Sequence, residues 1–124
     1  MRSSWKSLAF AVAVVVMCVA EPARSQQRRV VHVSAERFSF TPSEIVVEAG
    51  EEIELRLTSD DTAHGFRIAK TSVNVVIPKR GRREIVVPFR APEPGRYTFE
   101  CSRMCGAGHN FMRGVLIVRE RASR

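Results

Sequence analysis

The sequence predicts an all-β sandwich or barrel of about eight strands behind an N-terminal export signal. Short apolar runs recur at spacings of roughly 8–12 residues and are separated by proline and glycine, which is typical of sandwiches and barrels. No window shows a long apolar stripe with the 3.6-residue period of an amphipathic helix. The 124 residues are 44% hydrophobic and 27% charged, a composition of one globular domain rather than of a multidomain enzyme.

The first twenty-five residues, 1–25, are interpreted as a secretory signal. Arg2 and Lys6 lie in a short polar start, and an unbroken apolar run covers residues 8–20. A helix of that length is roughly 20 Å long at about 1.5 Å per residue, whereas a bilayer core is about 30 Å thick. Cleavage after Ala20 or Ser25 would leave a periplasmic or otherwise extracytoplasmic domain over 26–124. If the segment is retained, it is a single anchor, and only then do we expect membrane contact.

The expected strands follow one another closely. Ile53, Leu55 and Leu57 alternate with polar residues, which is the period of a half-buried strand. Turn residues such as Pro42, Gly50 and Gly81 interrupt the runs. Eight or nine strands are predicted from the apolar runs 30–33, 38–40, 45–47, 53–57, 66–68, 73–77, 85–89, 97–101 and 115–118.

The formal charge of +7 does not indicate a nucleic-acid partner. The basic residues are scattered apart from the run 79–83, which falls between two expected strands. Such a run is typical of a solvated turn, or of a patch for an acidic protein or a membrane surface. The three cysteines are too few for a disulfide scaffold.

One stretch, residues 101–112, concentrates side chains that bind soft metals. It contains Cys101, Cys105, His109, Met104 and Met112 between two expected strands. Thiolate, imidazole and a weak thioether together favour copper. We expect Met104 to pack within the loop and Phe111 to belong to the core.

A ligand from elsewhere in the chain is expected, because one loop rarely closes a metal site alone. His64 lies at a strand connection and is the better candidate, whereas His32 fits an ordinary strand position. Two thiolates, two imidazoles and one thioether suit two copper ions that share both sulfurs, each with one terminal imidazole. Three alternatives stay open: a disulfide, a zinc site, and a mononuclear blue copper site that leaves Cys101 idle.

The spacing Cys-x3-Cys-x3-His-x2-Met over Cys101–Met112 resembles the binuclear copper-A loop of cytochrome c oxidase subunit II and nitrous oxide reductase. The segments 61–66 and 38–50 resemble, respectively, that family's upstream histidine segment and the first strands of cupredoxins. The resemblance implies a cupredoxin-like Greek-key β-sandwich over 26–124 that binds two copper ions and has no catalytic residue. The implied ligands are bridging Cys101 and Cys105, terminal His64 and His109, weak axial Met112, and the backbone carbonyl of Arg103.

The chain also departs from the oxidase pattern. Arg103 stands where oxidase subunits carry an acidic residue that helps to bind magnesium, and the usual pair of N-terminal helices is missing. The single tryptophan, Trp5, lies in the signal, so the aromatic segment linked to cytochrome c has no clear match.

We therefore expect an exported one-electron carrier without a turnover site of its own. Its partners would be redox proteins such as a c-type cytochrome or the catalytic subunit of a terminal oxidase. The chain would act either alone or as a divergent, electron-accepting oxidase subunit. The alternatives are copper delivery and a mononuclear blue copper protein.

Overall fold

The alternation of apolar and polar residues builds strands with one buried face. In β4 (Glu52–Ser59), the side chains of Ile53, Leu55 and Leu57 are at most 1% exposed, and the residues between them face outward. A period of two is what a strand packed on one side requires. The computed structural model describes residues 27–123, so the predicted signal lies outside the described residues.

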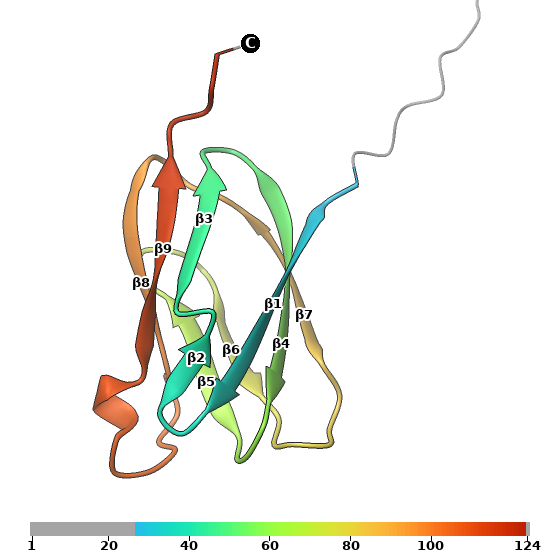
Figure 1. Cartoon of the computed structure of the whole chain (residues 1–124), viewed down its shortest axis with the longest axis vertical. Coiled ribbons are helices and arrows are strands. Elements are labelled where there is room, and N and C mark those ends of the chain that lie inside the picture. The colour runs from blue at the N-terminus through green and yellow to red at the C-terminus, as the bar shows by residue number, and fades with distance from the viewer. Residues whose placement is uncertain (1–26, 124) are drawn as a thin grey trace, which may run out of the picture.

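Two sheets pack face to face (Figure 1). The first has the order β2-β1-β4-β7 and the second β3-β9-β8-β5-β6. Besides β4, the elements are β1 (Arg29–Glu36), β2 (Ser39–Thr41), β3 (Glu44–Glu48), β5 (His64–Ile68), β6 (Asn74–Ile77), β7 (Ile85–Arg90), β8 (Gly95–Glu100), β9 (Arg113–Arg119) and a short 3₁₀ turn, η1 (His109–Phe111).

The topology combines hairpins with two parallel pairings. β1 runs parallel to β4, and β3 runs parallel to β9, while all other neighbouring strands are antiparallel. The all-β prediction is confirmed, with nine strands in the described part of the chain where about eight were expected. Within residues 27–123, no helix has the length and apolar character needed to cross a bilayer.

Three phenylalanines join the two sheets across the core. Phe40 of β2 contacts Phe66 of β5 and Phe99 of β8 edge-on, each with ring centroids 5.5 Å apart, and Phe66 and Phe99 are 5.3 Å apart. All three rings are buried. Aromatic pairs in this arrangement add to the free energy gained from burial. The cluster therefore fixes β5, which begins at His64, and β8, which ends just before Cys101.

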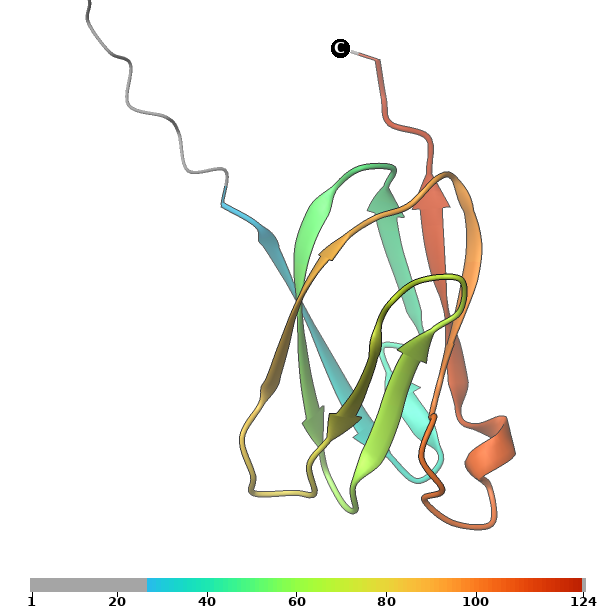
Figure 2. The same cartoon turned by 180° about the vertical axis from the view of Figure 1, so that it is seen from behind.

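The two ends of the sandwich differ. The 101–112 loop with η1 lies at one end, together with the β1–β2, β4–β5 and β6–β7 connections (Figures 1 and 2). The chain enters β1 and leaves β9 at the opposite end. The described termini therefore lie away from the loop that carries the candidate ligands.

Candidate metal centre

The core cluster determines where the first two candidate ligands lie. His64 is two residues before Phe66 on β5, and Cys101 is two residues after Phe99 at the end of β8. Because side chains two positions apart share a face of a strand, both ligands lie on the buried side. His64 is 0% exposed and Cys101 5% exposed. The structure places His64 inside a strand rather than in the connection before it.

The loop from Cys101 to Met112 is closed at its base. The N–H of Cys101 donates to the carbonyl oxygen of Met112 at 3.0 Å, so the loop begins and ends at one point. Within it, the N–H of His109 bonds the carbonyl of Gly106 at 3.1 Å. These backbone hydrogen bonds stabilise the conformation of the loop.

The loop needs glycine where it crosses an aromatic ring. Gly106 has φ +144°, which favours glycine, and a Cβ there would lie 2.9 Å from the ring of Phe38. A Cβ at Gly108 would lie 2.3 Å from the same ring. The ring of Phe38, in the β1–β2 turn, therefore packs directly against the backbone of the loop at Gly106 and Gly108.

The Sγ atom of Cys105 lies at the centre of the candidate ligand set. It is 3.6 Å from Cys101 Sγ, 3.8 Å from His109 Nδ1 and 3.8 Å from Met112 Sδ. Cys105 is 5% exposed and Met112 1% exposed. All of the sulfur donors in this set are thus buried.

Cys101 lies on the His64 side of the set. Its Sγ is 4.0 Å from His64 Nδ1 and 3.0 Å from the carbonyl oxygen of Arg103. The ligand atoms of His64, Cys101 and Cys105 all lie within 4.8 Å of one another. The structure therefore brings all six residues predicted from the sequence to one place, with the two histidines approaching different sulfurs.

Asp61 orients the imidazole of His64. Its Oδ1 is 2.6 Å from His64 Nε2, and its Oδ2 accepts the N–H of Arg37 at 2.8 Å. Burial acts to raise the pKa of Asp61, but hydrogen bonds from His64, Arg37 and Thr62 lower it below its usual value. An ionised carboxylate only accepts, so this contact favours a proton on Nε2, and the neutral ring with that tautomer would turn the Nδ1 lone pair towards the sulfurs.

Arg37 joins the two halves of the centre. Its backbone N–H binds Asp61, and its Nε donates to the carbonyl of Cys105 at 2.7 Å. Burial and the adjacent Cys101 raise the pKa of the Cys105 thiol to about 11, and the Arg37 guanidinium acts in the opposite direction. Cys105 is therefore a neutral thiol at pH 7, and a metal ion that binds it must displace a proton.

Close packing of the loop backbone against the backbone of β5 fixes the distance between the two segments. A Cβ at Gly65 would lie 2.6 Å from the backbone nitrogen of Arg103 and 2.7 Å from that of Ser102. Ser102 Oγ also donates to Asn74 Oδ1 at 2.9 Å, which ties the loop to β6. Glycine at 65 lets the segment between the two cysteines approach the strand that carries His64.

Two sequence expectations, for Phe111 and Met104, are wrong. Phe111 was expected in the core but is 82% exposed, because η1 turns its side chain outward. Met104 was expected to pack within the loop but is 73% exposed. His32 takes the ordinary strand position expected of it, with a side chain 70% exposed. The roles of Arg37, Phe38 and Gly65 were not found from the sequence.

A surface hollow reaches the His109 side of the centre. It has a volume of about 280 Å³ and is lined by Arg67, Glu100, Cys101, Ser102, His109, Asn110, Met112 and Arg113. His109 itself is half-buried, unlike His64. Among the two candidate imidazoles, His109 is thus the one that approaches solvent.

A two-layer β-sandwich with this loop at one end defines a cupredoxin. The chain belongs to the cupredoxin-like domain family, whose model matches residues 8–118. The domain division into a signal over 1–25 and a cupredoxin domain over 26–124 stays a prediction.

The predicted resemblance to oxidase subunits and nitrous oxide reductase is confirmed by sequence comparison. Cytochrome c oxidase subunit 2 of Thermus thermophilus is 37% identical over 91 residues, which cover 73% of this chain and 65% of that protein. Nitrous-oxide reductase of Cupriavidus necator is 30% identical over 99 residues, covering 77% of this chain but 15% of the relative. The chain thus spans less than two thirds of the length of these relatives.

Solved structures give the same assignment of fold. A haem-copper terminal oxidase dimer contains a chain with a TM-score of 0.66 and 25% identity, covering 77% of this chain and 68% of that one. The periplasmic domain of cytochrome oxidase subunit II of Bradyrhizobium japonicum has a TM-score of 0.66 at 19% identity, covering 74% and 84%. The blue copper protein auracyanin A of Chloroflexus aurantiacus has a TM-score of 0.60 at 16% identity, covering 75% and 100%.

Proposed function

We propose that the chain is an exported electron-transfer domain that holds two copper ions in a copper-A-type centre. Cys101 and Cys105 would bridge the two ions, and His64 and His109 would each bind one. The thioether of Met112 and the backbone carbonyl of Arg103 would be weak axial ligands. The single observation that carries the proposal is the convergence of these donors around the Sγ atoms of Cys101 and Cys105.

The distances within the donor set fit bound metal. Two ligands at about 2.0 and 2.3 Å from one ion in tetrahedral arrangement are separated by roughly 3.5 Å. The separations from Cys105 Sγ to Cys101 Sγ, His109 Nδ1 and Met112 Sδ are 3.6, 3.8 and 3.8 Å. Ions could therefore be bound with small movements of these side chains.

The position of the imidazoles supports two ions rather than one. His64 approaches Cys101 and His109 approaches Cys105, so each imidazole has its own sulfur neighbour. A mononuclear blue copper site would leave the buried thiol of Cys101 without a role. A zinc site would leave Met112 unexplained, although its sulfur lies 3.8 Å from Cys105 Sγ.

The protein would supply a rigid and dry environment. Asp61 and Arg37 hold His64 and the Cys105 carbonyl, and the ring of Phe38 supports the loop. When bound, a copper pair accepts and releases one electron, and a fixed donor set keeps the accompanying change in geometry small. His64 and Met112 are at most 1% exposed, which excludes water from most of the centre.

The partners we propose are redox proteins outside the cytoplasm. Relatives of this chain are named as cytochrome c oxidase subunits and as nitrous-oxide reductase, and two of the similar structures are oxidase subunits II. A c-type cytochrome and the catalytic subunit of a terminal oxidase are thus the partners to test. The chain would pass single electrons between them and perform no turnover itself.

The deciding experiment is copper content with low-temperature EPR of the copper-loaded protein. We expect about two copper ions per chain and a seven-line mixed-valence pattern. Two matched pairs of variants assign the ligands. His64→Gln and Met112→Leu should lose or alter the signal, whereas His32→Gln and Met104→Leu should not, because these two side chains are exposed.

One copper per chain with a four-line spectrum would replace the proposal by a mononuclear site. Failure to bind copper after reductive loading, with Cys101 and Cys105 oxidised to a disulfide, would remove it. Copper that passes rapidly to a chelator or an acceptor protein would favour delivery over electron transfer.

A further inference from the structure

Large apolar side chains are exposed around the candidate centre. Phe38 is 36%, Met104 73% and Phe111 82% exposed. The other exposed large hydrophobic residues of 27–123 are valines on strands: Val30, Val76 and Val86. Exposed aromatic and methionine side chains gathered at one place mark an interaction surface.

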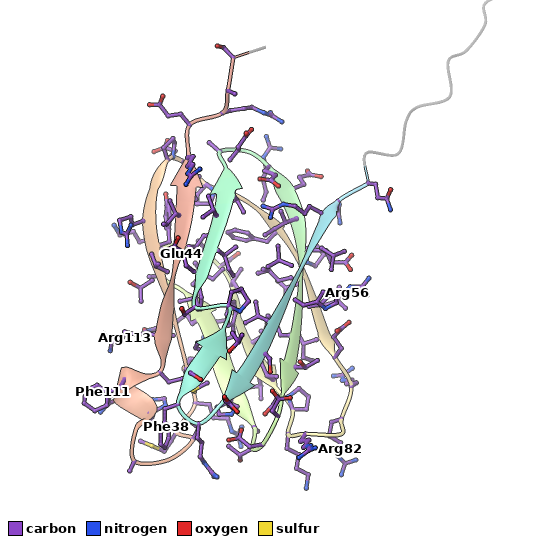
Figure 3. The ribbon with its side chains drawn as sticks, in the orientation of Figure 1. Phe38, Glu44, Arg56, Arg82, Phe111 and Arg113 are labelled. Atoms are coloured by element: carbon purple, nitrogen blue, oxygen red, sulfur yellow. The ribbon has the colours of Figure 1, made fainter. Side chains whose placement is uncertain are left out.

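Each of these apolar side chains has an arginine within two residues of it in the sequence: Arg37 precedes Phe38, Arg103 precedes Met104, and Arg113 lies two positions after Phe111. Figure 3 shows Phe38 and Phe111 at the same end of the molecule, with Arg113 near Phe111. We call this the loop-end surface, which consists of Arg37, Phe38, Arg103, Met104, Phe111 and Arg113. All six residues are exposed, so an apolar centre is accompanied by three cationic side chains.

A second cationic segment lies at the same end of the sandwich as the loop-end surface. The exposed turn at 79–83 contains four basic residues, and Arg82 lies at the same end as Phe38 and Phe111 (Figure 3). The N–H of Arg80 donates to the carbonyl of Asp61 at 2.9 Å, which attaches the turn to the connection before His64. The expectation of a solvated basic turn is thus confirmed, and its position adds positive charge at this end.

Most carboxylates at this end are engaged within the protein. Asp60 accepts the hydroxyl of Ser34 at 2.5 Å, and Asp61 accepts hydrogen bonds from His64 and Arg37. Glu100 pairs with Arg67. Glu36, beside Arg37, adds one exposed carboxylate. The basic side chains of the loop-end surface and of the 79–83 turn therefore outnumber the free carboxylates beside them, and we expect a positive electrostatic potential there.

Two of the arginines are held in fixed positions. Arg37 Nε donates to the Cys105 carbonyl, and Arg113 Nη2 donates to the carbonyl of Asn110 at 2.7 Å. Their remaining N–H groups are therefore oriented before any partner arrives, which lowers the entropy cost of binding. A fixed guanidinium fits a carboxylate at a fixed place on a protein better than the mobile phosphates of a lipid surface.

We propose that the loop-end surface docks an electron-carrier protein whose contact surface is acidic. Its carboxylates would meet the arginines and the 79–83 turn, and an apolar patch would cover Phe111 and Met104. The identity of the partner as an electron carrier rests on the proposed function, because the surface lies over His109 and Cys105. The inference that the partner's contact surface is acidic rests only on the basic side chains at this end of the protein.

The test measures binding of two haem proteins of opposite charge by titration calorimetry. The soluble domain of cytochrome b5 is the acidic probe and cytochrome c the basic one, each at low and high ionic strength. We expect the acidic probe to bind more tightly, with an affinity that falls as salt is added. Measurement on both copper-free and copper-loaded protein separates docking from the copper proposal, because the surface consists of protein side chains alone.

Matched variants locate the contact. Arg82→Glu/Arg83→Glu reverses two charges at the loop end, and Arg96→Glu/Arg119→Glu makes the same change in net charge near the opposite end. We expect the first pair to weaken binding of the acidic probe by about tenfold and the second by less than about twofold. Phe111→Ala should weaken it by roughly fivefold at any salt concentration, because it removes an apolar contact.

The proposal is overturned if both charge-reversed proteins lose affinity equally, since binding would then follow net charge alone. It is also overturned if Phe111→Ala has no effect, or if the basic probe binds more tightly. Vesicles containing anionic phospholipid that compete with the acidic probe at equal affinity would assign the surface to a membrane instead. If the unmodified protein has the expected copper spectrum but does not bind the acidic probe, this proposal is contradicted and the proposed function still stands.

Discussion

Gly65→Ala tests whether contact between β5 and the loop fixes the candidate centre. The added methyl group would lie 2.6 Å from the backbone nitrogen of Arg103 and 2.7 Å from that of Ser102. The Ser102 hydroxyl, at 2.2 Å, can rotate away, but the backbone cannot. The loop between the two cysteines must therefore move as a unit.

The size of the movement follows from these distances. Ordinary van der Waals contact begins at 3.4 Å, so the two contacts fall short by 0.8 and 0.7 Å. Overpacking of this kind costs about 1–3 kcal/mol of unfolding free energy. For a domain of this size the melting temperature should fall by roughly 5–20 °C. A displacement of about 0.8 Å also exceeds the roughly 0.5 Å tolerance of a metal site.

The assay combines thermal unfolding of the copper-free protein with copper affinity and EPR of the loaded protein. We expect a lower melting temperature, at least about tenfold weaker copper binding and an altered spectrum. Gly81→Ala is the matched control, because Gly81 has φ +76° and no atom lies within 4 Å of a Cβ there. The control should lose about 1–2 kcal/mol through its left-handed backbone and keep the spectrum of the unmodified protein.

A Gly65→Ala protein with a melting temperature within about 2 °C of the unmodified protein and the same spectrum would refute the reasoning. The close approach would then not restrain the loop. A spectral change of equal size in Gly81→Ala would also refute it, because backbone strain at a distance would explain both results.

Three further predictions concern the ligand support, the core and the effect of pH. Asp61→Asn should weaken copper binding by about 10–100-fold in chelator competition, since His64 loses its carboxylate partner; an unchanged affinity would contradict this. Phe40→Ala should lower the unfolding free energy by about 3–5 kcal/mol in urea denaturation, whereas a loss below about 1 kcal/mol would mean that the aromatic cluster contributes little. Burial acts to raise the pKa of Glu51, but hydrogen bonds from Arg29 and from a backbone N–H bring it below 4.5. This stabilisation is present above pH 4.5 and disappears as the pH falls through the depressed pKa, so the stability difference between the unmodified protein and Glu51→Gln should vanish in acid; a difference independent of pH would rule out the ionised pair.

The strands and the ligand loop could be predicted because their signals are local in sequence. The alternation in β4 and the spacing from Cys101 to Met112 are both visible within a dozen residues. The position of His64 beside the two cysteines could also be predicted, because it is a second imidazole at a strand boundary and fits the donor count. These signals do not depend on how distant segments pack.

The supporting residues could not be predicted, because their partners are distant in the chain. Arg37 lies 68 residues from Cys105, whose carbonyl it binds. Nothing local distinguishes Arg37 from the other arginines of the sequence. The errors at Phe111 and Met104 have a related cause, since hydrophobicity does not indicate which way a loop directs a side chain.

The parallel pairing of β3 with β9 joins two strands that are far apart in the sequence. In the described chain, β9 lies between β3 and β8, so β3 has no sheet partner until the last strand arrives. Contacts so distant in sequence form slowly. Docking of β9 also brings Met112 to the base of the loop, where its carbonyl accepts the Cys101 N–H. If the chain binds copper as proposed, a chain in which β9 has not yet docked would offer the thiols without the complete donor set, so we expect the centre to load after the second sheet is complete.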